Sequence, residues 1–199
     1  MIKLENVSFS YGEKQVLKGL NYTFPSKGVF AIMGASGEGK TTLLRLLAGL
    51  ERPSAGEITS THRKTAVAFQ EPRLIPWLDC ENNIKFVLSK ENNSSNTVSS
   101  TLRAFELESY EKTLPGALSG GMKQRLSLSR ALCVEADLLL LDEPFSALDT
   151  ALKKRVAPLI KDANPEGLTI IVTHDQQDAE LLGAQILTLA DSALSVEQK

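Results

Sequence analysis

The stretch from Met33 to Thr42, MGASGEGKTT, decides how the rest of this chain is interpreted. It fits the pattern G-x-x-x-x-G-K-[ST], follows the apolar run Val29 to Met33 and opens a helical pattern over Thr42 to Leu50. Glycines let successive backbone N–H groups converge on an anion at a helix N-terminus, where the helix dipole adds a favourable potential. A Gly-rich turn could match the pattern by chance, but the preceding strand and the following helix favour a phosphate-binding loop.

Each position of this loop has an expected role in binding a nucleoside triphosphate. Lys40 is expected to contact the β- and γ-phosphates, and the Thr41 hydroxyl is expected to ligate Mg²⁺. The residues expected to line the phosphates are Gly34, Ala35, Ser36, Gly37, Glu38, Gly39, Lys40, Thr41 and Thr42.

Composition places the chain among globular proteins of the cytosol. Its 199 residues are 42% apolar and 23% charged, enough for one sizeable core in one domain. A net charge of −2 provides no global positive field that would steer it to nucleic acid or anionic lipid. Cys80 and Cys133 match neither a disulfide framework nor a metal spacing. No signal peptide or membrane-spanning run is recognised, so work at a membrane would require another chain.

Strands that alternate with helices predict an α/β fold with a mostly parallel sheet. Leu138 to Leu141 and Leu168 to Thr173 are the clearest buried strands after Gly28 to Met33. Before them, Ile58-Thr59 and Ala66 to Phe69 predict two short strands joined as a tight hairpin.

The second half of the chain contributes further helices and a last strand. The predicted helices cover part of Glu71 to Lys90, roughly Val98 to Leu107, Met122 to Cys133, Ala151 to Ile160 and Gln176 to Leu182, and the predicted last strand covers Gln185 to Leu189. The stretch Glu91 to Ser100, rich in Asn and Ser, predicts a loop.

Carboxylates follow the strand Leu138 to Leu141. Asp142 is expected to hold the metal through water, and Glu143 to polarise the attacking water. The alternative is that both acids only cap the next helix, but a good phosphate loop elsewhere in the chain argues against it. His174 emerges at the end of another strand, where it could contact a γ-phosphate oxygen or the water. His62, in a polar link, is expected to have no such role.

Taken together, these residues resemble the ATP-binding subunit of ABC transporters, nearly from end to end. Leu118 to Arg125, LSGGMKQR, resembles the family signature, and Ser146 to Asp149 resembles its D-loop. The resemblance implies that Gln70 is a catalytic and metal-binding residue of the Q-loop, that His174 is the switch histidine and that Tyr11 stacks on adenine. It also implies a P-loop NTPase (RecA-like) α/β fold with an antiparallel β layer and a helical signature subdomain.

The expected organisation is one ABC ATPase domain over residues 1–199. The antiparallel layer is expected over about 1–30 and 57–69, the helical subdomain over about 71–130, and the catalytic core in the remainder. Glu38 departs from the family, since an acid beside phosphates is unfavourable unless its side chain points outward.

The signature predicts a second anion site at another helix N-terminus, made by the Ser119 hydroxyl and the N–H groups of Gly120 and Gly121. Because the phosphate loop already holds the phosphates, this second site should close on the nucleotide of another copy. The resemblance therefore implies a head-to-tail dimer with ATP and Mg²⁺ between the chains.

The expected partners are a transmembrane permease at the cytoplasmic face of the cell membrane and, indirectly, an extracytoplasmic solute-binding protein; nucleic acid is not expected. Gln70 to Trp77, QEPRLIPW, resembles importers for nitrate, sulfonates and taurine, although Trp77 could equally be an ordinary half-buried aromatic residue. A soluble ABC ATPase acting on ribosomes or nucleic acid is the alternative; such chains usually carry two such domains or a long coiled coil. An exporter half and a nucleotide-sensing module fit less well.

Overall fold

In the computed structural model, which describes residues 1–88 and 95–196, strand β6 (Leu138–Asp142) is buried along its whole length. Successive side chains of β6 pack alternately in two different apolar clusters, as expected when successive residues point to opposite faces of a sheet. Leu138 and Leu140 pack in one apolar cluster, and Leu139 and Leu141 pack in the other. The continuous run of leucines is therefore explained by helices or strands covering both faces.

Strand β6 belongs to a six-stranded sheet of order β5-β6-β7-β3-β8-β9. The other strands of this sheet are β5 (Thr65–Ala68), β7 (Leu168–Val172), β3 (Gly28–Met33), β8 (Gln185–Ala190) and β9 (Ala193–Val196). All adjacent pairs are parallel except β8 with β9, which is antiparallel. The mostly parallel α/β fold predicted from the sequence is confirmed, and β9 was not predicted.

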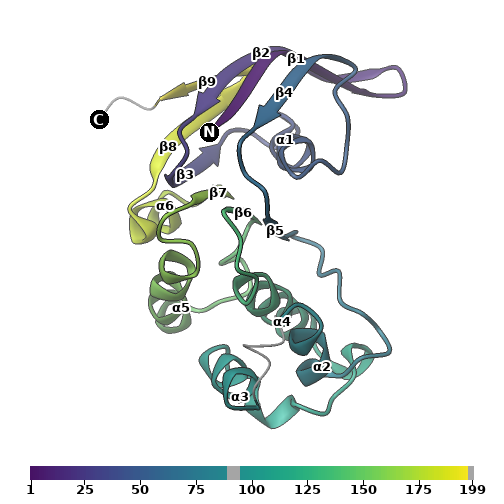
Figure 1. The fold of residues 1–199 in the computed structure, drawn as a ribbon, viewed down its shortest axis with the longest axis vertical. Helices are drawn as coiled ribbons and strands as arrows, with labels where there is room; N and C mark the ends of the chain where they lie inside the picture. The colour runs from purple at the N-terminus through teal and green to yellow at the C-terminus, as the bar shows by residue number, and fades with distance from the viewer. Residues whose placement is uncertain (89–94, 197–199) are drawn as a thin grey trace.

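A separate antiparallel sheet of order β2-β1-β4 lies above one face of this sheet, with helix α1 (Lys40–Leu47) between them (Figure 1). Its strands are β1 (Ile2–Tyr11), β2 (Lys14–Phe24) and β4 (Ala55–Ser60). Phe24 packs edge-on against Phe30 of β3, with ring centroids 5.6 Å apart. One apolar cluster thus joins the antiparallel sheet, α1 and the upper face of the parallel sheet.

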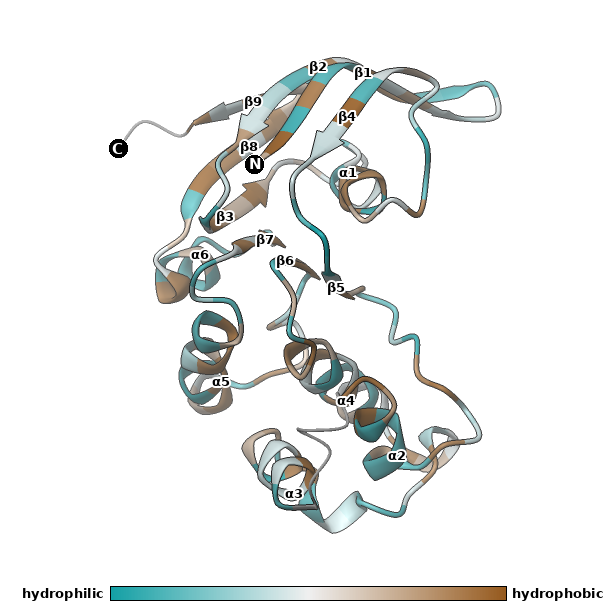
Figure 2. Cartoon of the chain, in the orientation of Figure 1, coloured by the Kyte–Doolittle hydropathy of each residue, from teal (hydrophilic) through white to brown (hydrophobic). Residues whose placement is uncertain are grey.

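The helices gather on the opposite face and extend into a lobe at the far end of the molecule (Figure 1). They are α2 (Cys80–Lys85), α3 (Ser95–Ala104), α4 (Gly120–Leu132), α5 (Thr150–Ala163) and α6 (Gln176–Leu182), with short 3₁₀ turns at Glu108–Tyr110 and Pro115–Ala117. Their apolar sides face inward (Figure 2), and the second cluster of buried residues runs from the sheet through α4 into α2 and α3. Side chains of Asp79, Ser119, Asp149 and Asp175 cap four of these helices.

The predicted hairpin between Ile58-Thr59 and Ala66 to Phe69 is wrong. Strand β4 pairs with β1, whereas β5 pairs with β6 in the other sheet. The polar link between them crosses from one sheet to the other, because the Asp137 carboxylate accepts hydrogen bonds from the backbone N–H groups of Arg63 and Lys64 at 2.8–3.1 Å. The antiparallel layer therefore ends before residue 65, and β3, from residue 28, also lies outside it.

Helix bounds around the polar loop also differ from expectation. Helix α2 ends at Lys85, so Val87 and Leu88 lie beyond it. Helix α3 begins at Ser95, inside the stretch predicted as a loop, and ends three residues before the predicted Leu107. Of that predicted loop, residues 91–94 lie outside the described residues. Across 1–88 and 95–196, none of the helices has the length and apolar character needed to span a bilayer.

Gly56 is required where β4 meets β1. Its φ is 80°, and a Cβ atom there would lie 2.3 Å from the Asn6 carbonyl oxygen and 2.4 Å from that of Glu5. Gly56→Ala should therefore lower the free energy of unfolding by about 1–3 kcal/mol or more in urea titrations. Gly116→Ala is the matched control, since its Cβ would meet nothing within 4 Å. Equal losses in both variants would contradict this explanation.

Candidate functional site

The phosphate-loop sequence forms a turn between β3 and α1 whose backbone requires glycine. Gly34 has φ of 147°, and a Cβ atom there would lie 2.3 Å from the carbonyl oxygen of Leu189. Gly39 has φ of 90° and precedes the first helical residue without a side-chain cap. Other residues would be strained at both positions, so the spacing of the two glycines follows from the shape of the turn.

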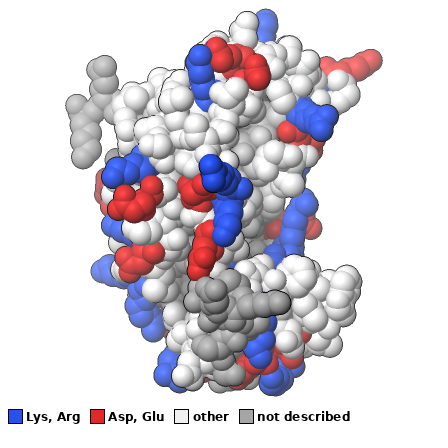
Figure 3. Space-filling model, viewed as in Figure 1, with Lys and Arg blue, Asp and Glu red and all other residues white. Residues whose placement is uncertain are grey.

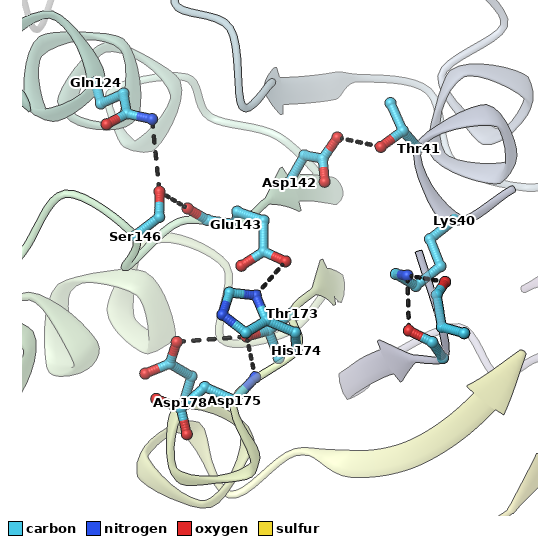
Figure 4. Close-up of polar contacts among 12 residues, drawn as sticks. Lys40, Thr41, Gln124, Asp142, Glu143, Ser146, Thr173, His174, Asp175 and Asp178 are labelled. Atoms are coloured by element: carbon cyan, nitrogen blue, oxygen red, sulfur yellow. Dashed lines mark hydrogen bonds and ion pairs between the residues drawn. The ribbon is translucent and has the colours of Figure 1, made fainter. Parts of the chain in front are cut away.

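The Lys40 side chain folds back over this turn. Its Nζ donates hydrogen bonds to the carbonyl oxygens of Gly34, at 2.8 Å, and Ala35, at 2.7 Å (Figure 4). A lysine ammonium has three donors and no acceptor. The charge is therefore held at the mouth of the turn, where phosphate oxygens can replace or join these two carbonyl groups.

Asp142, the last residue of β6, is joined to the first turn of α1. The Thr41 hydroxyl donates to its Oδ2 at 2.8 Å (Figure 4). Burial raises the pKa of Asp142, and the charge of Glu143 raises it further, while the Thr41 hydrogen bond and the charges of Lys40 and Arg45 oppose the shift. A buried carboxylate whose charge is disfavoured would gain from a nearby cation.

The oxygen donors of Thr41 and Asp142 fit Mg²⁺, which prefers oxygen ligands and retains several waters. Among the described residues, no group of three or more His, Cys, Asp or Glu side chains could hold a metal ion by itself. The donor set therefore fits a cation that takes its remaining ligands from phosphate and water.

Glu143 directly follows and has an unusual backbone. Its φ is 52°, a value uncommon outside glycine, and its N–H donates to the Val172 carbonyl oxygen at 2.9 Å. Strained residues cluster at functional sites. Oε1 of Glu143 lies 2.9 Å from Nδ1 of His174 (Figure 4), so the ends of β6 and β7 bring the two predicted catalytic side chains into contact.

The Glu143–His174 pair is asymmetric in its exposure. The Glu143 side chain is 12% exposed, whereas that of His174 is 75% exposed. The hydrogen bond that the protonated Nδ1 donates to the Glu143 carboxylate, and the negative charge of that carboxylate, raise the pKa of His174, while burial opposes the shift. The imidazole can therefore turn toward a ligand while Glu143 keeps one of its nitrogens engaged.

Most of the predicted residues line one cleft of about 530 Å³. Those on its wall are Tyr11, Gly34, Ser36, Gly37, Gly39, Lys40, Thr41, Thr42, Gln70, Asp142, Glu143 and His174. Five predicted residues are not on this wall, namely Ala35, Glu38, Ser119, Gly120 and Gly121. Glu38 is partly buried and is not on this wall.

Sequence reasoning missed four residues of the cleft wall, which are Lys14, Gln15, Val16 and Val172. The first three follow the turn between β1 and β2, and Lys14 pairs with Tyr11 across it. A hairpin over residues 2–24 with its turn directly after Tyr11 places these three residues beside Tyr11. The Tyr11 hydroxyl accepts a hydrogen bond from Arg45 Nη1 at 3.2 Å, and its ring stands edge-on to Phe9.

Gln70 lines the cleft and contacts helix α4. Its carbonyl oxygen accepts a hydrogen bond from Gln124 Nε2 at 3.2 Å, and the same nitrogen lies 3.5 Å from Ser146 Oγ. Ser146 in turn donates to the carbonyl oxygen of Glu143 at 2.9 Å (Figure 4). Gln124 of α4 therefore connects the segment after β5 with the segment after β6.

The second predicted anion site lies apart from this cleft. Ser119 caps α4, and its hydroxyl accepts from the Met122 N–H at 3.3 Å. Ser119 and Gly120 are exposed, and α4 lies in the helical lobe, away from α1 (Figure 1). The N-terminus of α4 thus faces solvent rather than the cleft of its own chain.

Comparisons with known proteins agree with this geometry. A family model described as ABC transporter matches residues 17–146. An aliphatic sulfonates import ATP-binding protein of Corynebacterium glutamicum is 42% identical over 193 residues, covering 94% of this chain and 79% of the relative. A spermidine/putrescine import ATP-binding protein of Spiroplasma citri is 37% identical over 210 residues, covering 98% of this chain and 60% of the relative. Among solved structures, a dimeric ATP-binding cassette in a post-hydrolysis state bound to ADP and Pi matches with a TM-score of 0.86 and 29% identity, covering 100% of this chain and 98% of that one.

The raised pKa of His174 predicts a titration that can be measured directly. Histidine signals followed by NMR should place this pKa above the ordinary value of about 6.5, and Glu143→Gln should lower it by removing the largest causes of the shift. Protonated His174 should therefore stabilise the fold below pH about 6.5, and this contribution should vanish as the pH rises through the folded-state pKa.

His62 is the internal control for this titration, because the sequence has two histidines. Burial is the largest cause that lowers the pKa of His62, and Glu143 is not among the causes. A His174 pKa that stays unchanged in Glu143→Gln would show that the contact between the two side chains does not persist in solution.

Proposed function

This chain belongs to the ABC transporter family as an ATP-binding protein that hydrolyses ATP, and on that premise we propose which residues bind and cleave ATP and which partner uses the energy. The observation that carries the proposal is the meeting of Lys40, Asp142 and Glu143 in one cleft while the N-terminus of α4 faces away from it.

ATP binding is assigned to the phosphate loop and to Tyr11. The Lys40 ammonium, held by two carbonyl oxygens, would turn to the β- and γ-phosphates, and loop N–H groups would hold the phosphate oxygens. The Tyr11 ring, fixed by Phe9 and Arg45, would stack on adenine. Thr41, Asp142 and Gln70 would hold Mg²⁺, which neutralises phosphate charge when bound.

ATP hydrolysis is assigned to Glu143 with His174. The Glu143 carboxylate would accept a proton from the water that attacks the γ-phosphate. His174 would keep one carboxylate oxygen in place through Nδ1 and leave its other ring nitrogen for the γ-phosphate. The largely buried Glu143 side chain and the exposed imidazole support this division of labour.

A complete site is proposed to need two copies of the chain. Ser119 with the N–H groups of Gly120 and Gly121 forms an anion site that is exposed and remote from its own cleft. In a head-to-tail dimer it would close on the γ-phosphate bound by the other copy. The solved cassette with ADP and Pi is dimeric, which supports this arrangement.

The permease is proposed to dock on the loop from Arg73 to Asp79 at the cytoplasmic face of the membrane. Trp77 in this loop is 77% exposed and Phe86, directly after α2, is 69% exposed, and large exposed apolar side chains mark interaction sites. Asn83 holds the loop in place, since its side chain bonds to the backbone of Ile75, Leu78 and Asp79. The loop is thus ordered before a partner binds.

The transported substrate is proposed to be a small sulfonate or related anion, delivered by an extracytoplasmic solute-binding protein. This rests on the named transport of aliphatic sulfonates by several relatives and on the sequence around Trp77. A relative named for spermidine and putrescine is nearly as similar, so the ATPase alone constrains the substrate weakly. Acidic and basic side chains are interspersed over the face shown in Figure 3, without a basic patch that would favour nucleic acid there.

The transporter reconstituted in vesicles with its permease and solute-binding protein tests this function. Uptake of a short alkanesulfonate should require ATP, and Trp77→Ala should lower uptake per ATP hydrolysed several-fold, because the exposed indole is lost from the contact. The ATPase rate of the isolated Trp77→Ala chain should change little.

Leu50→Ala is the control for loss of an exposed large apolar residue, since Leu50 is 59% exposed and follows α1 outside the helical lobe. Normal coupling in Trp77→Ala would contradict the docking surface. A solute-binding protein that takes up polyamines and ignores sulfonates would overturn the substrate assignment and leave the ATPase assignment intact.

A further inference from the structure

Lys153, in the first turn of α5, contacts two acidic residues, Asp175 and Asp178, that follow His174 in the sequence. Its Nζ lies 2.6 Å from Oδ1 of Asp178 and 3.4 Å from Oδ2 of Asp175. The Asp178 side chain is only 6% exposed and that of Lys153 is 23% exposed. Burial lowers the pKa of Lys153, but the hydrogen bonds and charges of the two carboxylates outweigh burial and raise it.

The Asp178 carboxylate also fixes the backbone that carries His174. Asp178 Oδ2 accepts a hydrogen bond from the Thr173 hydroxyl at 3.3 Å, and that hydroxyl accepts from the Asp175 N–H at 3.1 Å (Figure 4). Thr173 is fully buried. The residues immediately before and after His174 are thereby locked to α6, and Lys153 attaches this assembly to α5.

Helix α5 is also anchored to Glu143. Asp149 caps α5, three residues after Ser146, whose hydroxyl bonds to the Glu143 carbonyl oxygen. Lys153 lies one turn further along the same helix and approaches the ring of Phe145 at 5.9 Å. Glu143 and His174 are therefore connected in two ways, indirectly through α5 and Lys153 and directly by the 2.9 Å contact between their side chains.

We infer that Lys153 is a positioning residue for ATP hydrolysis, which holds the His174 loop to α5 and so sets the place of the imidazole against the Glu143 carboxylate. The inference rests on the roles proposed above for Glu143 and His174. The His174 side chain is 75% exposed, so its distance from the Glu143 carboxylate depends on how firmly the two backbones are joined. A displacement of about 1 Å at a reacting group can cost about 10²-fold in rate.

A purely structural role is the competing explanation. Removing Lys153 leaves the buried Asp178 carboxylate unpaired, which is destabilising wherever it occurs. The two roles differ in a variant that removes both charges. Lys153→Met with Asp178→Asn leaves no uncompensated buried charge, since the remaining carboxylate of Asp175 is 37% exposed. The amide oxygen introduced by the second substitution could still accept from Thr173, but the attachment to α5 is lost.

The experiment measures steady-state ATP hydrolysis and equilibrium ATP binding by the purified full chain. Lys153→Met should lower kcat by about 10- to 100-fold while the affinity for Mg-ATP changes by less than about twofold, because Lys153 is not on the wall of the cleft. Lys153→Arg, which can still bond to both carboxylates, should retain most of the activity. Lys154→Met is the matched control, since the next residue on the helix is exposed.

The double variant and the histidine NMR signals decide the outcome. The double variant should fold with near-normal stability and keep the low kcat, and the ring signals of His174 should shift in Lys153→Met and in the double variant but not in Lys154→Met. Recovery of kcat in the double variant would overturn the inference, because it would show that Lys153 acts only by neutralising the Asp178 carboxylate. A low kcat with unmoved His174 signals would overturn it as well. If the wild-type chain did not hydrolyse ATP, the proposed roles of Glu143 and His174 would fail, and the NMR signals would still report whether Lys153 positions the imidazole.

Discussion

Strands β3, β6 and β7 are buried on both faces, and this constraint determines where the chain can place polar chemistry. Along such strands every side chain faces a core, so charged groups can appear only where the strands end. Lys40 and Thr41 follow β3, Asp142 and Glu143 end or follow β6, and His174 follows β7. The hydrogen bond from Thr41 to Asp142 joins two of these ends across about a hundred residues of sequence.

The residues of the site that lower the stability of the fold lie at these strand ends. Asp142 is buried with a raised pKa, and Glu143 has a positive φ. The surrounding leucines of β6 and the isoleucines of β7, all buried, supply the stability that tolerates them. Gln124, Ser146 and Lys153 then connect the strand ends to α4 and α5 by hydrogen bonds and an ion pair, so the helical lobe is linked to the residues around the cleft.

Much of this arrangement could be predicted from the sequence where one residue pattern has one physical explanation. The spacing of Gly34 and Gly39 follows from a turn that excludes Cβ atoms, and the apolar run before Asp142 could only be a strand buried on both faces. The link from Ser60 to Lys64 was ambiguous, because a short polar segment can close a hairpin or cross between sheets; its anchor on Asp137 lies more than seventy residues away. The positive φ of Glu143 and the contacts of Lys153 also depend on tertiary neighbours, so no local pattern indicates them.

The central claim is that each ATP site is shared, with Lys40 from one copy and Ser119 from the other, and mixing two inactive variants tests it most directly. Lys40→Ala and Ser119→Arg should each abolish hydrolysis alone. In a mixed dimer, one site carries both defects and the other carries neither. In an equal mixture, about half of the dimers should be mixed, and one of the two sites in each mixed dimer should be active. ATPase activity that reappears on mixing and rises with protein concentration is the expected result. Mixtures that stay as inactive as the separate variants, at concentrations where dimers form with Mg-ATP, would contradict the shared site.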